Sequence, residues 1–203
     1  MTRMRMRIQI LGLTEVRWKE KGDFYSDDVG VIYSGGTTRE RGVAHILDRH
    51  AAQCVDRDES LSDRLMRVKL RGEPVDIMIV VVYMPTTAHP DEEIEEMYDK
   101  IEEVLNIGKG NDYMILLGDW NAVVGEGKDG LVTGHFGLGR RNKRGDMLVD
   151  FYRRRGLTIA NTCFEHHPRR RYTWKALGDI RRLQIDYIIV RERYQNSVGA
   201  DCD

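Results

Sequence analysis

The sequence predicts an α/β fold in which two mixed β-sheets pack face to face and helices cover their outer faces. Short apolar runs separated by turn residues dominate the first part of the chain, and strands alternate with amphipathic helices in the second part. The 203 residues are 41% hydrophobic and 32% charged, with no internal repeat or low-complexity tract. This length and composition suit one globular domain, so we expect a single domain over residues 1–203.

The first part of the chain is predicted to consist of strands and tight turns. The expected strands cover residues 8–11, 29–33, 42–47, 64–70 and 75–83. Residues 22–28 are rich in glycine and aspartate and are expected to form a loop. Apolar and basic side chains alternate over 64–70, which indicates a half-exposed strand. Because Pro85 follows the β-branched run 75–83, we expect a central strand that ends at Tyr83.

Two amphipathic helices are predicted in the second part. Residues 91–107 carry apolar side chains at helical spacing, with three acidic residues in the first turn and Gly108 and Gly110 at the end. Residues 143–155 repeat this spacing and place three arginines in the last turn before Gly156. The remaining strands are expected at 113–117, 157–160, 172–174 and 184–190.

Charge is distributed unevenly, although the formal net charge is only −1. Residues 88–130 contain 12 acidic and 3 basic side chains, whereas residues 139–182 contain 13 basic and 4 acidic ones. This pattern fits either two merely solvated surfaces or a basic face for a polyanion such as nucleic acid.

Neither a membrane span nor a secretory signal is visible in the sequence. The three cysteines, Cys54, Cys163 and Cys202, are odd in number and lack a C-x-x-C spacing. We therefore expect reduced thiols, a nuclear or cytoplasmic protein, and no membrane partner.

The candidate site is organised around Gly118-Asp119-Trp120-Asn121, which closes the apolar run 113–117. Side chains alternate along a strand, so Asp119 and Asn121 are expected to project together while Trp120 packs inward. A carboxylate beside a carboxamide suits water activation with phosphate orientation, or metal binding. An Asp/Asn turn without chemistry is the alternative.

Other apolar runs also end in a polar residue of catalytic type. These residues are Glu15, Tyr83 and Asp186. Residues at strand ends can converge on one rim of a sheet, so we expect them to join Asp119 and Asn121 in one pocket. Each residue alone has an ordinary structural explanation. Glu15 could be a surface acid, Tyr83 a strand-end aromatic and Asp186 an acid paired with an arginine.

Four stretches together resemble motifs of the endonuclease/exonuclease/phosphatase superfamily, whose fold is DNase I-like. They cover residues 11–18, 82–85, 118–122 and 184–187. The sequence is most similar to the apurinic-endonuclease-like domain of LINE-type non-LTR retrotransposons and to craniofacial development protein 2-like proteins. Residues 134–142, 159–162, 172–174 and 199–202 resemble that subgroup.

The resemblance implies a role for each site residue. Glu15, together with Asp119, would hold Mg²⁺, or Mn²⁺ in its place, as hard oxygen ligands. Tyr83 would contact the scissile phosphate, Asp119 would activate the attacking water, and Asn121 would orient water and phosphate. Asp186 would orient a histidine of a Ser-Asp-His motif.

Two motifs of the family are not found in this sequence. They are an active-site asparagine on a strand before Glu15 and the Ser-Asp-His beyond Asp186. We therefore expect a nuclease domain that is incomplete at both ends, and weak or no activity from this chain.

Nucleic-acid contacts are expected from the basic region. The candidates are Arg140, Arg141, Asn142, Arg169, Arg170, Arg171 and Trp174. Basic residues beside aromatics suit a hairpin that grips DNA. Trp174 matches the position that shapes a pocket for an extruded nucleotide, although a core tryptophan is an equal reading.

The sequence thus predicts a Mg²⁺-dependent DNA endonuclease domain of the target-nicking type. Its partners would be DNA and, in a full-length element, a reverse transcriptase domain. The first alternative is a decayed or domesticated copy that binds nucleic acid or protein without cutting. The second is another phosphoesterase of the superfamily, acting on inositol phosphates, sphingomyelin or RNA.

Overall fold

The computed structural model describes residues 8–107 and 112–199. The expected helix end at Gly108 and Gly110, and Cys202, lie outside these residues. The chain divides into two compact units, residues 1–84 with 99–118 and residues 85–98 with 119–203, and each is described here by itself. None of the described helices is long and apolar enough to cross a membrane.

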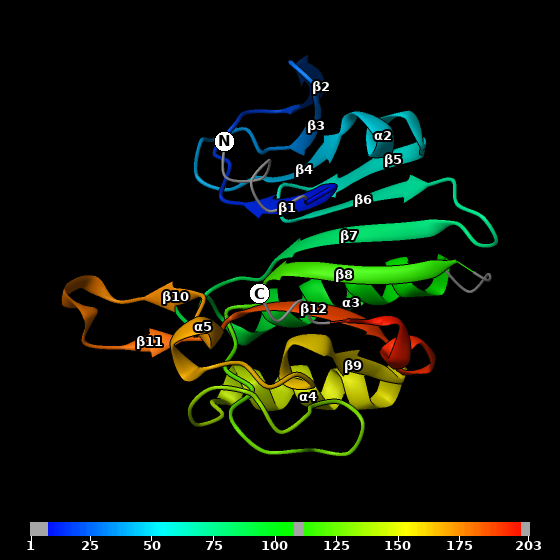
Figure 1. Ribbon diagram of the computed structural model, residues 1–203. Helices are drawn as coiled ribbons and strands as arrows, with labels where there is room; N and C mark the ends of the chain where they lie inside the picture. The colour runs from blue at the N-terminus through cyan, green and yellow to red at the C-terminus, as the bar shows by residue number, and fades with distance from the viewer. Residues whose placement is uncertain (1–7, 108–111, 200–203) are drawn as a thin grey trace. The chain divides into compact units, whose positions relative to one another are not determined.

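Unit 1 contains a four-stranded antiparallel sheet in the order β1-β4-β3-β2 (Figure 1). Its strands are β1 (Ile10–Thr14), β2 (Lys21–Ser26), β3 (Val29–Ser34) and β4 (Val43–Asp48). Every neighbouring pair runs antiparallel. This sheet is therefore not mixed, in contrast to the expectation for both sheets. A short helix, α2 (Arg49–Gln53), follows β4 and is capped by the Asp48 side chain, which accepts from Ala51 N at 2.8 Å.

The second layer of unit 1 holds four strands in the order β5-β6-β7-β8. These are β5 (Val55–Ser62), β6 (Leu65–Leu70), β7 (Ile77–Tyr83) and β8 (Tyr113–Asp119). The β5–β6 and β6–β7 pairs are antiparallel. Tyr113 N donates to Asp76 O at 2.8 Å, and Gly118 lies against the Val82 carbonyl, so β8 runs parallel to β7. This layer is mixed, as predicted.

One apolar core lies between the two layers of unit 1. Val43 of β4 packs with buried side chains of β6 and β7, and Ile10 and Ile32 lie against the same cluster. Gly12 allows β1 to approach closely, because a Cβ there would lie 2.0 Å from Leu117 Cδ1. The packing of these strands therefore fixes the ends of β1 and β7, where the candidate residues Glu15 and Tyr83 lie.

Three expectations for unit 1 are wrong in detail. Residues 22–28 do not form a loop, because residues 21–26 form the edge strand β2. The glycine and aspartates of this segment are typical of loops, which is why the sequence did not indicate a strand. Strand β5 was not anticipated, since its sequence is largely polar. Strand β6 is not half-exposed, because Arg67 is only 8% exposed and its guanidinium pairs with Glu59 on β5.

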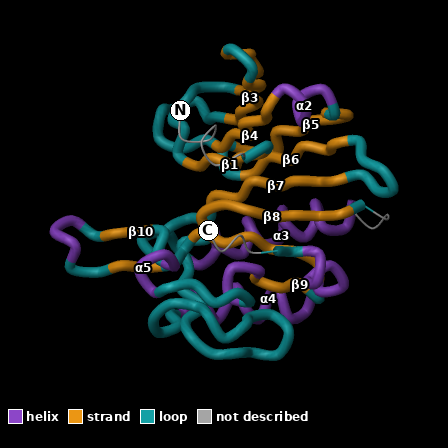
Figure 2. The backbone as a smooth tube through the Cα atoms, viewed as in Figure 1, coloured by secondary structure: helices purple, strands orange, loops and turns teal. Residues whose placement is uncertain are grey.

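Unit 2 is built around helix α4 (Lys143–Arg155) and the antiparallel pair of β9 (Leu157–Ile159) with β12 (Asp186–Arg191), as Figure 2 shows. The Asn142 side chain caps α4 by accepting from Gly145 N at 2.8 Å, and Gly156 ends it with a φ of 61°. Phe151 and Tyr152 are buried, and the Tyr152 ring lies edge-on to Trp120 at 5.4 Å.

Helix α3 (Asp91–Ile107) has the predicted bounds, and its first residues belong to unit 2. There Asp91 accepts from Lys143 at 2.5 Å and from Arg144 at 2.7 Å. Lys143 and Arg144 hold the pKa of the Asp91 carboxyl below its usual range. These contacts join the starts of α3 and α4.

A short helix and a hairpin complete unit 2. Helix α5 (Pro168–Arg171) precedes the hairpin of β10 (Trp174–Lys175) and β11 (Arg182–Leu183), and the hairpin extends away from α4 and β9 in Figure 1. Leu177 and Ile180 at its tip are 97% and 85% exposed.

Candidate active site

The first group of candidate residues lies in unit 1, where Glu15 and Tyr83 are in direct contact. The Tyr83 hydroxyl donates to Glu15 Oε1 at 3.1 Å. Arg17 Nη2 donates to the other carboxylate oxygen, Oε2, also at 3.1 Å. The structure thus brings together two residues that are 68 positions apart in the sequence. Arg17 was not among the site residues predicted from the ends of apolar runs.

The backbone holds Glu15 in an unusual conformation. Glu15 and Arg17 both have φ values of 56°, a region that costs energy for residues with a Cβ. Val16 N and Arg17 N donate to the carbonyls of Gly42 and Arg41 at 3.2 and 2.8 Å. Gly42 can serve here because its own φ is 117°. Contacts on both sides therefore set the direction of the Glu15 side chain.

Tyr83 is held by Arg64, a second residue that sequence reasoning missed. Tyr83 is only 7% exposed, and the Arg64 guanidinium lies 4.8 Å from its ring centroid. Arg64 Nη1 also donates to the Tyr83 carbonyl at 3.3 Å. A buried cation over an aromatic face adds attraction beyond packing. The phenol is consequently fixed at the end of β7.

The second group lies in unit 2 around Trp120. The Asp119 carboxylate accepts from Asn121 N at 2.9 Å, and Asn121 has a φ of 47°, where asparagine is better tolerated than most residues. Trp120 is 2% exposed, and its backbone N donates to Ile185 O at 2.8 Å. The inward packing of Trp120 is confirmed. The Trp120–Ile185 bond also places residues 119–121 beside Asp186.

Asp186 begins β12 and is oriented by Thr173. Thr173 Oγ1 accepts from the backbone N of Ile185 and of Asp186, both at 3.1 Å. Burial raises the pKa of the Asp186 carboxyl, and a side-chain hydrogen bond from Thr173 opposes this shift. Within residues 8–107 and 112–199, no arginine forms an ion pair with Asp186, and Arg182 pairs with Asp179 instead. Thr173 was noted only as part of a subgroup motif.

Some of the residues predicted to contact nucleic acid are exposed, and others form hydrogen bonds or ion pairs within the fold. Arg140, Arg169 and Trp174 are exposed, and Trp174 at 42% is not a core residue. Arg141 instead donates to Val124 O and Asp129, both at 2.8 Å. Together with Arg153, it holds the pKa of Asp129 below its usual range.

Two further candidates are bound within the fold. The Asn142 side chain caps α4, and it also accepts from Val123 N at 3.1 Å. Arg171 donates to His166 O at 2.5 Å and lies 5.6 Å from the Phe136 ring centroid. Arg170, on α5, is exposed.

Metal-binding capacity is limited to small sets of ligands. Over the described residues, no group of three or more His, Cys, Asp or Glu side chains is placed to hold a metal ion. Adjacent His166 and His167 do not form a centre, and His167 Nδ1 instead accepts from Arg169 N at 3.2 Å. Mg²⁺ differs from zinc because it commonly binds through one or two carboxylates, waters and substrate phosphates. The half-exposed Glu15 carboxylate fits that mode.

Comparison with solved structures defines the fold. The chain matches the endonuclease domain of TRAS1, a telomere-specific non-LTR retrotransposon, with a TM-score of 0.63 and 15% identity over 98% of this chain and 80% of that one. It matches the 3′-5′ exonuclease NExo from Neisseria meningitidis with a TM-score of 0.68 and 18% identity over 94% and 79%. The AP endonuclease LMAP from Leishmania major gives 0.66 and 10% over 96% and 73%.

The chain therefore has the DNase I-like fold of the endonuclease/exonuclease/phosphatase proteins, which confirms the expected fold class. Among curated proteins, it is similar to craniofacial development protein 2 of Tragulus javanicus and of Bos taurus. Each is 36% identical over 206 residues, covering 98% of this chain. The chain spans about a third of those relatives, 36% and 35% of their lengths. No protein-family model matches it.

Proposed function

We propose that this chain is a metal-dependent phosphodiesterase domain that hydrolyses the DNA backbone. The observation that carries the proposal is the carboxylate of Asp119, held beside Asn121 and next to Asp186 by the buried Trp120. These groups supply an anionic proton acceptor and a neutral donor in one place. The DNase I-like fold, shared with nucleases and phosphatases, supports the same reaction class.

The proposed roles follow from the hydrogen-bonding capacity of each side chain. Asp119 takes a proton from water as the water oxygen bonds to phosphorus and the P–O bond of the leaving strand breaks. Asn121 donates to a phosphoryl oxygen and fixes its position. The Tyr83 hydroxyl, which now donates to Glu15 at 3.1 Å, donates instead to the phosphate. Fixed donors of this kind stabilise charge as it develops on the phosphate.

Glu15 is the residue of unit 1 proposed to hold Mg²⁺ through its carboxylate. When bound, the ion supplies positive charge beside the phosphoryl oxygens. Glu15 Oε2 accepts from Arg17 at 3.1 Å, so the positive charge of the arginine would oppose the binding of a cation by this carboxylate. Mn²⁺ shares the preference for carboxylate oxygens and is the natural substitute.

A nicking assay on supercoiled plasmid with Mg²⁺ tests the proposal. Asp119→Asn should lower nicking by roughly 10²–10³-fold, because one electrostatic contributor to the transition state is lost. Glu15→Gln should lower it and shift the requirement to higher Mg²⁺. Glu96→Gln, an exposed acid on α3, is the matched control and should leave the rate unchanged. Nicking by Asp119→Asn at the wild-type rate would contradict the assigned roles.

DNA as the substrate is proposed from the exposed basic residues of unit 2. Arg140→Ala and Arg169→Ala should each weaken duplex binding and reduce the salt slope by about one. Arg141→Ala should instead lower stability, since its guanidinium bonds within the fold. Binding that is flat across a salt series would remove the electrostatic basis. We also infer a reverse transcriptase partner in a longer LINE-type element, which copurification from a full-length protein would test.

A second candidate function is a module that binds nucleic acid without cutting it. The double engagement of Glu15 by Arg17 and Tyr83 favours it, because both carboxylate oxygens already accept hydrogen bonds. The two candidates give different results in one experiment. Salt-dependent DNA binding without any Mg²⁺- or Mn²⁺-dependent nicking supports the binding module, whereas nicking that Asp119→Asn abolishes supports the enzyme.

A further inference from the structure

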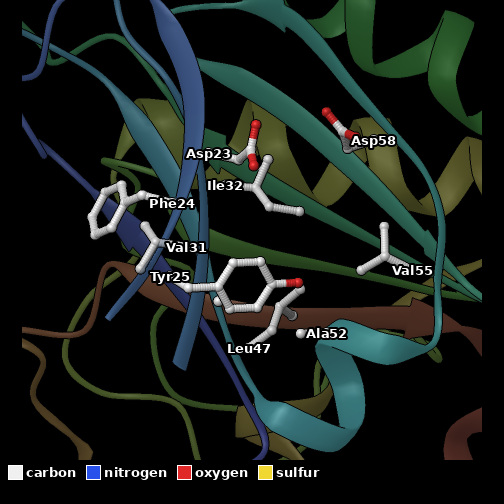
Figure 3. Close-up of a pocket in the computed structure, with 10 residues that line it drawn as sticks. Asp23, Phe24, Tyr25, Val31, Ile32, Leu47, Ala52, Val55 and Asp58 are labelled. Atoms are coloured by element: carbon white, nitrogen blue, oxygen red, sulfur yellow. The ribbon is translucent and has the colours of Figure 1, made fainter. Parts of the chain in front are cut away.

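Three adjoining hollows lie in unit 1 between β2–β3 and β5. The central hollow, drawn in Figure 3, has a volume of about 220 Å³. It shares Asp23, Ile32 and Asp58 with a second hollow of about 350 Å³. It shares Tyr25 with a third of about 330 Å³. Together they form one groove, here called the β2–β5 groove.

The floor of the groove is apolar. Leu47 and Ile32 line it from the four-stranded sheet, while Ala52 and Val55 line it from α2 and β5. Tyr25 is opposite Gly30 in the β2–β3 register, and a Cβ on Gly30 would lie 3.3 Å from the Tyr25 ring. The ring therefore packs across the glycine, yet Tyr25 remains 71% exposed. Figure 3 shows this ring beside Leu47 and Ala52.

Two carboxylates border the same apolar floor. Asp23 and Asp58 are exposed, and in the described chain neither has an ion-pair partner. Asp27 and Lys21 also line the groove without an ion pair among the described residues, whereas Glu59 is paired with Arg67, so the unpaired charges of the groove are net negative. Two uncompensated negative charges over apolar side chains favour a ligand with cationic heads on apolar stems, as in arginine and lysine.

The groove also borders a strand that can accept a neighbour. Strand β2 is the last in the order β1-β4-β3-β2, and five of its six residues are exposed. The backbone groups on the outer side of such a strand can pair with another chain. Because side chains alternate along β2, Asp23 and Tyr25 project together on one face. An added strand would place every second side chain against them.

We propose that the β2–β5 groove binds an extended basic segment of a partner protein, which pairs with β2 as a fifth strand. Alternate arginine or lysine side chains of that segment lie over the apolar floor and reach Asp23 and Asp58. Main-chain hydrogen bonds to β2 supply affinity, and the carboxylates supply selectivity for basic sequences. This surface is independent of the nuclease residues.

The charges favour this occupant over two others. A second copy pairing through β2 would bring a second set of the same unpaired carboxylates, Asp23 and Asp27 among them, close to the first, and like-charge repulsion opposes this. Nucleic acid is repelled by the same carboxylates. A basic polypeptide strand is the extended partner whose charge complements the groove.

A labelled short peptide that alternates valine and arginine is the probe, and its anisotropy is measured with the full chain. The double variant Asp23→Asn, Asp58→Asn should weaken binding roughly 5- to 20-fold, since two exposed ion pairs are lost. Asp56→Asn, on the same strand but outside the groove, is the matched control and should bind as the wild type. A peptide alternating valine and glutamate should not bind.

Strand pairing is tested separately with a valine–arginine peptide whose alternate backbone nitrogens are methylated. It keeps the charge and loses the main-chain donors, so its affinity should fall well below that of the parent peptide. Amide hydrogen exchange should slow over residues 21–26 when the parent peptide binds. The inference is overturned if the double variant binds the parent peptide as tightly as the wild type, or if methylation leaves the affinity unchanged.

Discussion

At the scale of single residues, the chemistry proposed for unit 1 depends on which groups donate hydrogen bonds to the two carboxylate oxygens of Glu15. One accepts from Tyr83 and the other from Arg17, each at 3.1 Å. The Arg17 side chain is 64% exposed, so its ion pair is screened by water and contributes little to folding. Its main effect is to place a positive charge beside the carboxylate that is proposed to bind the cation.

Removing Arg17 should therefore improve metal binding. We expect Arg17→Ala to tighten Mg²⁺ binding by about 2- to 5-fold, the range of an exposed ion pair. Terbium luminescence sensitised by the nearby Trp18 measures this without reference to activity, with Mg²⁺ as competitor. Arg49→Ala, which removes an ion pair with Asp28 at 3.8 Å, is the control and should leave the affinity unchanged. A weaker affinity in Arg17→Ala would show that the arginine supports the site.

Burial and Thr173 act in opposite directions on the pKa of Asp186 in unit 2. Burial raises the pKa of Asp186, and the Thr173 hydroxyl opposes this by bonding to the charged carboxylate. Thr173→Val should raise the pKa of Asp186 further, as followed by carboxyl carbon chemical shifts across a pH series. Thr173→Ser keeps the hydroxyl and should restore the wild-type value. An unchanged pKa in Thr173→Val would show that another group sets it.

At the scale of elements, helix α4 depends on one capping side chain. Asn142 accepts from Gly145 N at 2.8 Å and from Val123 N at 3.1 Å, so it satisfies the helix and the preceding loop at once. Asn142→Ala should lower the free energy of unfolding by about 1–2 kcal/mol, the usual cost of a lost N-cap. Urea denaturation measures this, and Asn142→Asp should retain most of the stability. Loss of DNA binding without any loss of stability would instead support the predicted contact of Asn142 with DNA.

The two long helices were predictable because their apolar spacing and terminal residues act locally. The predicted bounds 91–107 and 143–155 match α3 and α4. Strand β2 was not predictable, because its exposed, edge position removes the alternation that identifies a strand. The candidate residues at the ends of β7 and β8 followed from apolar runs. Arg64 and Thr173 did not, since their partners lie in other segments and no local pattern records those contacts.

At the scale of the whole molecule, stability in acid depends on His45, which is fully buried in β4. Burial lowers the pKa of His45 from 6.5 to about 4, and neither ring nitrogen has a hydrogen-bond partner among the described residues. The unfolded chain therefore takes up the proton first as the pH falls. The contribution of neutral His45 to the free energy of unfolding is therefore complete above pH 6.5. It is lost progressively as the pH falls from 6.5 to about 4.

The size of this effect follows from the separation of the two pKa values. The free energy of unfolding should fall by about 3 kcal/mol across that window, at about 1.4 kcal/mol for each pKa unit. His45→Leu should flatten this part of the pH profile when urea midpoints are compared at each pH. His50→Leu, an exposed histidine of α2, should keep the wild-type slope. Proton NMR of the His45 ring checks the pKa directly, and titration near 6.5 would refute the explanation.

The tetrapeptide 118–121 carries a consequence for how this chain can diverge. A Cβ on Gly118 would lie 2.0 Å from the Val82 carbonyl oxygen, and the φ of Gly118 is 139°. Trp120 fills the core of unit 2, while Asn121 occupies a left-handed conformation beside the Asp119 carboxylate. Folding alone thus constrains three of the four positions. If the proposed cleavage of DNA were lost in a descendant, selection for folding would still keep most of the motif, so the motif in a related chain is evidence of folding before it is evidence of catalysis. Glu15, whose carboxylate is half-exposed, would be the earlier residue to change.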